Sequence, residues 1–197
     1  MFTFEEPSGD DLEALLDRQR RLPLSYDEAG ATLAMVPSGY SVDHSRIRLG
    51  EGRECFSRAA AALAGWRMFD TGWTRISPAD AAVCEDEVVC VVARHFGFYS
   101  ANPARIIRVL DEQSRYGFVY GTLPAHSERG EERFSVELLP DGSVWYDLYS
   151  FARGGDALVR LGYPVRRLVQ RRFARDSQRA MLEAVGSPPE KTVGKIL

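Results

Sequence analysis

The sequence predicts an α+β fold in which helices pack on one side of an antiparallel β-sheet, the longest of them at the C-terminus. Segments rich in β-branched and aromatic residues follow one another from residue 88 to residue 151, with short connections that carry turn signals. Helical periodicity is confined to the N-terminal third and to residues 156–185. Strands and helices segregated in this way are typical of α+β domains.

Length and composition indicate one globular domain. The chain has 197 residues, of which 45% are hydrophobic and 27% charged, so it can bury a substantial core. We expect the core at residues 24–185, preceded by an N-terminal helix within residues 1–23 and followed by a tail at 186–197.

Charge and cysteine content exclude several classes. The net charge of −3 argues against a nucleic-acid partner or an anionic membrane surface. Three cysteines do not make a disulfide framework. There is no signal peptide and no apolar run long enough to span a membrane, so we expect a cytoplasmic protein.

The N-terminal part predicts two helices and three strands. The first helix is expected at Ser8–Arg21, where acids lie early and arginines late, as the helix dipole favours. The second is expected at Arg53–Met68. The strands are expected at Thr32–Val36, Tyr40–Leu49 and Trp73–Ile76.

The second half predicts a five-strand meander. The strands are expected at Val88–Phe96, Ile106–Leu110, Tyr116–Leu123, Arg133–Leu138 and Val144–Phe151. The polar stretch before Arg133 is expected to be a charged loop. Gly117 and Gly121 share one face of their strand, which predicts a close approach or a strong bend of the sheet.

The C-terminal helix is expected at Asp156–Val185. Pro164 falls inside the pattern, so the helix is either kinked there or begins near it. Arginines line much of one side of the pattern, at Arg160, Arg167, Arg171, Arg175 and Arg179.

Several separated motifs stand out over roughly residues 24–185. They are Tyr26–Thr32, Pro37–Tyr40, Trp66–Phe69, Gly72-Trp73, Tyr120–Pro124 with His126, Gly130–Phe134, Leu161–Pro164 and Gln170–Phe173. Together they resemble one uncharacterised family of bacterial and plant proteins, known as domain of unknown function nineteen-ninety. Ala125 and Ser127 depart from the pattern, because the family's loop is expected to hold Gly and Pro there.

The resemblance implies no established activity. The element order is similar to that of helix-grip proteins, in which a curved antiparallel sheet wraps a long C-terminal helix and leaves an apolar cavity. This similarity implies a fold but fixes no function.

The polar stretch from Thr122 to Arg133 is the first candidate site. His126 beside Glu128 or Glu131 could act as a general acid and base at neutral pH. The alternative is a hairpin loop whose charged side chains face water.

Asp147 is the second candidate, because aromatic residues flank it on one strand face. It is a ligand anchor if that face points into a cavity, and a structural residue if it pairs with an arginine of the last helix or faces outward. The other candidate ligand-binding residues are Tyr26, Tyr40, Trp73, Tyr120, Thr122, Glu132 and Arg133.

No spacing of histidines and cysteines resembles a metal site, and no cofactor fingerprint is present. Three functions remain open. The first is binding of a small apolar or amphipathic molecule between sheet and C-terminal helix. The second is an enzyme on the same scaffold. The third is a module that binds a partner through the arginine side of the helix.

Overall fold

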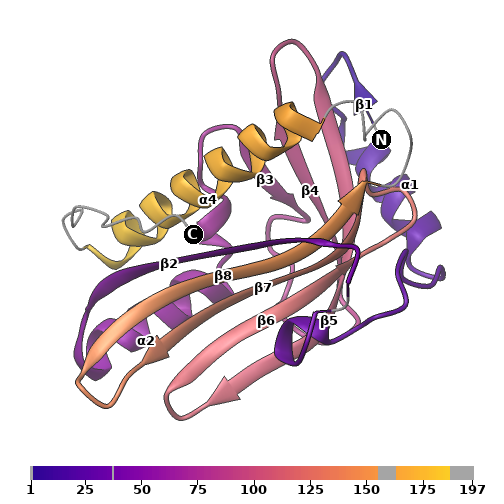
Figure 1. Ribbon diagram of the computed structural model, residues 1–197. Coiled ribbons are helices and arrows are strands. Elements are labelled where there is room, and N and C mark those ends of the chain that lie inside the picture. The colour runs from indigo at the N-terminus through magenta and orange to yellow at the C-terminus, as the bar shows by residue number, and fades with distance from the viewer. Residues whose placement is uncertain (1, 37, 155–162, 187–197) are drawn as a thin grey trace.

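The computed structural model describes residues 2–36, 38–154 and 163–186, and in the last of these ranges it describes side chains from residue 167 onward. Its centre is an antiparallel sheet with the strand order β2-β8-β7-β6-β5-β4-β3, and the short β1 pairs with β5 beside this path (Figure 1). The strands are β1 Phe2–Thr3, β2 Ser41–Glu51, β3 Thr74–Ser77, β4 Val88–Arg94, β5 Tyr99–Glu112, β6 Arg115–Thr122, β7 Glu128–Leu138 and β8 Ser143–Gly154.

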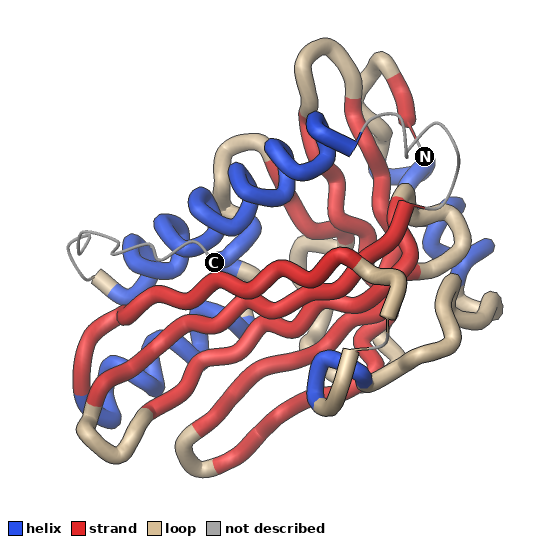
Figure 2. Tube along the Cα trace, in the orientation of Figure 1, coloured by secondary structure: helices blue, strands red, loops and turns tan. Residues whose placement is uncertain are grey.

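Helices cover both faces of the sheet. The helices α2 (Gly52–Ala64) and α4 (Tyr163–Val185) lie on the inner, concave face. The helix α1 (Gly9–Gln19) packs against the outer face of β4 and β5. Figure 2 shows the long strands sweeping as one curved sheet past α4. The α+β prediction and the helix-grip arrangement are therefore confirmed, but the expectation that helices pack on one side alone is wrong.

The inner core is filled by aromatic rings. Phe118 and Phe134 are fully buried and stack with their ring centroids 5.3 Å apart. Trp66 packs edge-on against Phe118 at 4.8 Å, and Phe69 contacts Phe134 at 5.7 Å. Rings at these separations add a directional attraction to the apolar burial that stabilises the core.

Three polar contacts fix α4 to the strands beneath it. The Tyr146 and Ser177 hydroxyls lie 2.8 Å apart in the core. The Trp73 indole donates to Asp176 at 3.0 Å, and the Gln178 amide donates to the Ser45 hydroxyl at 3.0 Å. Because each buried polar group finds a partner, the helix has a defined position over the sheet.

The first helix begins where the sequence predicts. The Ser8 hydroxyl accepts a hydrogen bond from the Asp11 amide, and the Asp11 carboxylate accepts one from the Ser8 amide, which is a complete capping box. Its buried leucines pack on the outer face of β4, and they are Leu12, Leu15 and Leu16.

The strand expected at Thr32–Val36 is wrong. A 3₁₀ turn, η1, occupies Ala31–Leu33, and Gly30 before it has a left-handed φ of 88°. The Glu131 carboxylate accepts hydrogen bonds from the Gly30 and Thr32 amides. A tertiary contact therefore curls this segment, and local strand propensity does not decide its conformation.

Two boundaries also differ from expectation. The second helix ends at Ala64, because Trp66 adopts a left-handed φ of 58° before the turn η2 at Arg67–Phe69. The charged stretch before Arg133 is mostly strand, since β7 pairs with β8 as far as Glu128 opposite Gly154. Its charges alternate between the two faces of the sheet.

The C-terminal helix begins at Tyr163, with Pro164 in its first turn, where the missing amide hydrogen costs nothing. The alternative of a start near Pro164 is confirmed. The earlier part of the expected helix, with Arg160, lies outside the described residues.

Candidate functional site

A row of polar residues crosses the inner face of the sheet. Asp43 on β2 is paired with Ser150 on β8, Ser150 with Glu132 on β7, and Glu132 with Tyr120 on β6. Side chains directly opposite one another on neighbouring strands share a face and lie about 5 Å apart at Cβ. The strand register thus gathers four polar side chains from distant parts of the sequence; we call them the polar row.

The polar row borders the aromatic core. The next inward-facing row contains Leu148, Phe134 and Phe118, all at most 5% exposed. Within the polar row, Tyr120 is buried, whereas Asp43, Ser150 and Glu132 each keep part of their surface exposed. The row is therefore a polar margin beside a filled apolar core.

Tyr120 and Glu132 form the closest contact in the row. The Tyr120 hydroxyl donates to a Glu132 carboxylate oxygen at 2.6 Å. Withdrawal from water raises the pKa of Glu132 to about 7; the hydrogen bond from Tyr120 opposes this, while the negative charges of Glu128 and Asp43 add to it. Glu132 therefore takes up and releases a proton near neutral pH.

The N-terminal half of α4 lies over this margin. The Arg167 guanidinium forms an ion pair with Asp43. The Gln170 amide donates to the two Glu128 carboxylate oxygens at 3.3 and 3.2 Å. Phe173 packs edge-on against Phe134 at 6.4 Å. The helix thus contributes a cation, an amide and a ring beside the row.

Sequence reasoning identified Tyr120 and Glu132 but missed Asp43, Ser150 and Gln170. The alternation of Tyr120 with Gly121 placed the tyrosine on one face, yet the register between strands was needed to bring Asp43 to the same row. A polar residue flanked by apolar residues on the same strand face is the signal that could have indicated Ser150.

His126 lies at the connection before β7. Its Nδ1 accepts a hydrogen bond from the Glu128 amide at 2.9 Å, and burial lowers its pKa to about 4. Thr122 is tied to structure nearby, because its hydroxyl lies 2.6 Å from the Ser25 hydroxyl and accepts from the Gly130 amide at 2.9 Å. His126 is therefore neutral at pH 7.

Glu131 lies on the opposite face of β7 from Glu132. It is 2% exposed and accepts hydrogen bonds from the Tyr26 hydroxyl at 2.9 Å, the Gly30 amide at 2.7 Å and the Thr32 amide at 2.9 Å. The Thr32 hydroxyl donates to it as well. The structure therefore does not bring Glu131 and His126 together, and Glu131 holds the segment before β2 on the outer face.

The outer face also receives most of the other aromatic and charged candidates. Arg133 donates to the Asp147 carboxylate at 3.0 Å and lies over the Tyr149 ring at 5.2 Å. The other Asp147 oxygen lies 2.7 Å from His44 Nε2. Asp147 thus lies on the outer face of the sheet. Its arginine partners are Arg133 on β7 at 3.0 Å and Arg46 on β2 at 3.9 Å, and neither comes from the C-terminal helix.

Tyr26 and Tyr40 flank Phe151 on the same outer face. Their rings contact Phe151 edge-on at 5.8 and 4.9 Å. The Tyr40 hydroxyl donates to Glu28 at 2.6 Å. Trp73 lies elsewhere, under α4, where Arg172 stacks on its ring at 4.5 Å. The predicted ligand-binding residues therefore fall into separate groups, and Tyr120 and Glu132 alone share the polar row.

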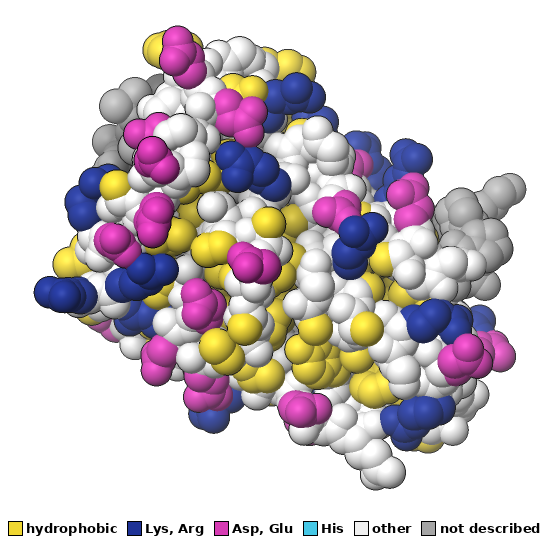
Figure 3. Space-filling view, turned by 180° about the vertical axis from the view of Figure 1, so that it is seen from behind, with side chains coloured by type: hydrophobic (Ala, Val, Ile, Leu, Met, Phe, Trp, Pro, Cys, Tyr) yellow, Lys and Arg dark blue, Asp and Glu magenta, His cyan; other side chains and the backbone are white. Residues whose placement is uncertain are grey.

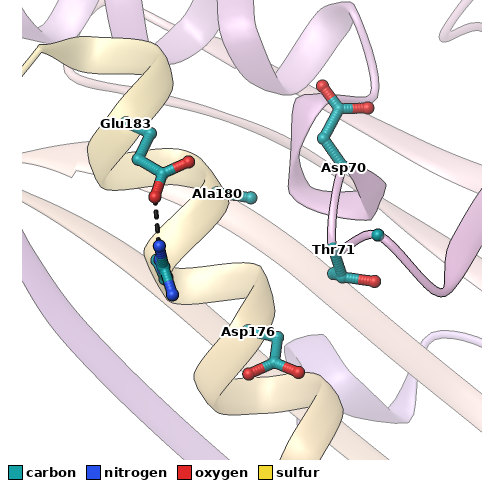
Figure 4. A pocket seen from close by; sticks show the side chains of 7 residues that line it. Asp70, Thr71, Asp176, Ala180 and Glu183 are labelled. Atoms are coloured by element: carbon teal, nitrogen blue, oxygen red, sulfur yellow. Dashed lines mark hydrogen bonds and ion pairs between the residues drawn. The ribbon is translucent and has the colours of Figure 1, made fainter.

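A surface groove of about 370 Å³ lies between the loop at Asp70–Gly72 and the second half of α4 (Figure 4). Its acids already have partners: Asp70 pairs with Arg67, and Glu183 pairs with Arg179. Asp176 accepts from the Trp73 indole. The groove is therefore lined by satisfied ion pairs.

The arginine side of α4 is largely neutralised. Arg167 pairs with Asp43, Arg175 with Asp176 and Arg179 with Glu183. On the face seen from behind, acidic and basic side chains alternate around a patch of hydrophobic ones, and neither sign dominates (Figure 3).

The described residues hold neither a cluster of metal ligands nor a membrane-spanning helix. Among residues 2–36, 38–154 and 163–186, no three His, Cys, Asp or Glu side chains gather as a metal site. In the same part of the chain, every helix is too short or too polar to cross a bilayer.

Comparison with known proteins identifies relatives. A UPF0548 protein of Dictyostelium discoideum is 35% identical over 209 residues, covering 95% of this chain and 97% of that protein. A UPF0548 protein of Deinococcus radiodurans is 36% identical over 198 residues, covering 94% and 100%. A hypothetical protein of Helicobacter pylori, jhp0584, has a similar fold, with a TM-score of 0.50 and 10% identity over 83% of this chain and 94% of that one. The family model described as "Domain of unknown function (DUF1990)" matches residues 25–180, and the chain belongs to this family.

Proposed function

We propose that the protein binds a small amphipathic molecule at the polar row. The observation that carries this proposal is the half-buried Glu132 beside the buried Tyr120 hydroxyl, at the edge of a filled aromatic core. Ligand sites combine apolar walls with a few placed polar groups. The polar row and its apolar neighbours have this composition.

The position of the proposed ligand follows from which part of the inner face is already filled by side chains. Phe118, Phe134 and Tyr146 occupy the middle of the inner face and are fully buried, so the ligand does not enter there. The margin holds partly exposed polar groups, and the Ser150 hydroxyl has no hydrogen-bond partner within the described residues. The polar group of the ligand contacts Ser150 and Glu132, and its apolar part lies against α4.

Acid–base catalysis at the same row is the second candidate. A carboxyl with a pKa of about 7 can both donate and accept a proton at physiological pH. In this candidate Glu132 is the acid and base, and Tyr120 holds its carboxyl in position.

A neutral fluorescent probe tests the binding proposal. N-phenylnaphthylamine, which brightens in apolar surroundings, is titrated into the protein and into the variant Ser150→Leu. The substitution replaces the Ser150 hydroxyl with a larger apolar side chain in the middle of the row. We expect saturable binding of one probe per chain, weakened at least about tenfold by Ser150→Leu, since about 1.4 kcal/mol of lost contact has this effect.

The matched control is Ser57→Leu on the exposed side of α2, which should leave probe binding unchanged. Absence of saturable binding, or equal binding by the protein and Ser150→Leu, would contradict the proposal.

A further inference from the structure

Glu132 differs from Asp43 and Asp147 in the kind of partner it has. Asp43 pairs with Arg167, and Asp147 pairs with Arg133. Glu132 accepts a hydrogen bond from the neutral Tyr120 hydroxyl and has no cationic partner among the described residues. A half-buried carboxylate without a counter-ion is costly, because burial of a charge is offset only by pairing.

The groups around Glu132 reinforce this asymmetry. From the sheet, Glu128 and Asp43 add negative charge, and both act on the Glu132 carboxyl. Tyr146 on β8 lies near enough for its own pKa to be raised, first by burial and also by the Glu132 charge.

From α4, Gln170 is neutral. Arg167 brings a positive charge to the row, and it is already engaged by Asp43 and by the side-chain oxygen Oε1 of Gln170. An anionic ligand would be repelled by the carboxylates of the row, whereas a cationic ligand would be attracted by the Glu132 carboxylate, which has no counter-ion in the described part of the chain.

Aromatic rings next to the carboxyl suit the same ligand. The Tyr120 ring packs against Phe134 at 5.5 Å, and Phe134 lies beside Phe173 of α4. Ring faces attract cations, and ring edges and alkyl chains pack together. A carboxylate beside aromatic rings is a chemically consistent environment for an alkylammonium group.

We propose that the polar group of the ligand is a protonated amine, which forms an ion pair with Glu132 and packs its alkyl part beside Phe173. This inference rests on the proposed binding function and adds the charge of the ligand. Because the ammonium group stabilises the charged carboxylate, a Glu132 side chain that is protonated before binding releases its proton when the ligand binds.

Three compounds with the same alkyl chain test the charge directly. Decylamine, decanol and decanoic acid compete with bound N-phenylnaphthylamine at about one pH unit above the Glu132 pKa of about 7. We expect decylamine to bind at least about tenfold more tightly than decanol, and decanoic acid to bind more weakly than either, because like charges repel across a desolvated contact.

The variant Glu132→Gln keeps the shape and removes the charge. It should lose the preference for decylamine, so that decylamine and decanol bind this variant with equal affinity. Calorimetry in two buffers of different ionisation enthalpy, near the Glu132 pKa, should show release of a fraction of a proton per decylamine bound, and this release should vanish in Glu132→Gln.

The outcomes separate the two proposals. If the probe binds at the row but decanoic acid or decanol competes as well as decylamine, the amine assignment is overturned and the binding function stands. If Glu132→Gln retains the preference for decylamine, the amine does not pair with Glu132. If the probe itself does not bind, the binding function fails and the amine assignment fails with it.

Discussion

The Tyr120 hydroxyl donates a 2.6 Å hydrogen bond to Glu132 from the position directly opposite on the neighbouring strand. Both side chains point to the inner face, where α4 covers the sheet. The pair therefore joins a register fixed by the fold to a carboxyl that titrates near neutral pH, with a pKa of about 7.

Removing the hydroxyl should raise the pKa of Glu132 further. The hydrogen bond favours the charged carboxylate, so Tyr120→Phe is expected to increase the pKa by about one unit, the equivalent of one hydrogen bond to a charged group. The measurement is a pH titration of the isotope-labelled Glu132 carboxyl carbon by NMR. Tyr116→Phe, on the same strand face but four residues away along β6, is the control. An unchanged or lowered pKa in Tyr120→Phe would contradict the assigned contact.

Stability should depend on pH through Glu132. Its pKa is about 7 in the folded protein and 4.5 in the unfolded chain. Between these values the folded state keeps a proton that the unfolded state has released, so the free energy of unfolding falls as pH rises through this window and is constant above it. Glu132→Gln lacks this titration. Denaturant unfolding at a series of pH values should therefore show that the free energy of unfolding of the variant, relative to that of the parent protein, increases from pH 4.5 to about 7. A constant difference in the free energy of unfolding across this window would exclude the raised pKa.

Glu131 should be a stability residue. Glu131→Ala leaves the Tyr26 hydroxyl and the Gly30 and Thr32 amides without their acceptor, which we expect to cost about 3 kcal/mol. Hydrogen exchange at the two amides should accelerate far more than in α1. Glu54→Ala removes an exposed carboxylate paired with Arg58 and should cost less than about 1 kcal/mol. Equal effects of the two substitutions would mean that Glu131 does not hold this segment.

Gly117 should not tolerate a side chain. A Cβ at this position would lie 2.2 Å from the Phe134 carbonyl oxygen and 2.8 Å from the Ser135 Cα, so β6 and β7 would have to move apart. Gly117→Ala is expected to cost about 2–3 kcal/mol by overpacking. A Cβ at Gly9 meets nothing within 4 Å, and Gly9→Ala should be close to neutral. Thermal unfolding of both variants measures the contrast, and a stable Gly117→Ala would disprove the close approach.

The sequence predicted the strands and helices whose signals are local. The apolar run of β4, the beginning of α1 next to Ser8 and the start of α4 near Pro164 are all found. The sequence-based prediction failed where a distant residue decides the local conformation. This happens at Thr32, whose amide and hydroxyl bind Glu131 about a hundred positions away.

For the candidate site, local sequence signals likewise identified single residues but not how the fold brings them together. Alternation along a strand indicated that Tyr120 faces away from Gly121, and polar character drew attention to Glu132. Joining them to Asp43 and Ser150 required the register of four strands, which hydrophobic pattern and turn geometry set together. Asp147 shows the converse, because its aromatic neighbours suggested a pocket and the register places it on the outer face with Arg133.

Adjacent glutamates on opposite faces of β7 provide the most direct test of ligand binding at the polar row. The carboxyl carbons of Glu131 and Glu132 are isotope-labelled and followed by NMR while N-phenylnaphthylamine is added to saturation. Binding at the row predicts a progressive shift of the Glu132 signal and an unchanged Glu131 signal. If the probe saturates the protein while the Glu132 signal stays in place, the molecule binds elsewhere and the proposed function is wrong.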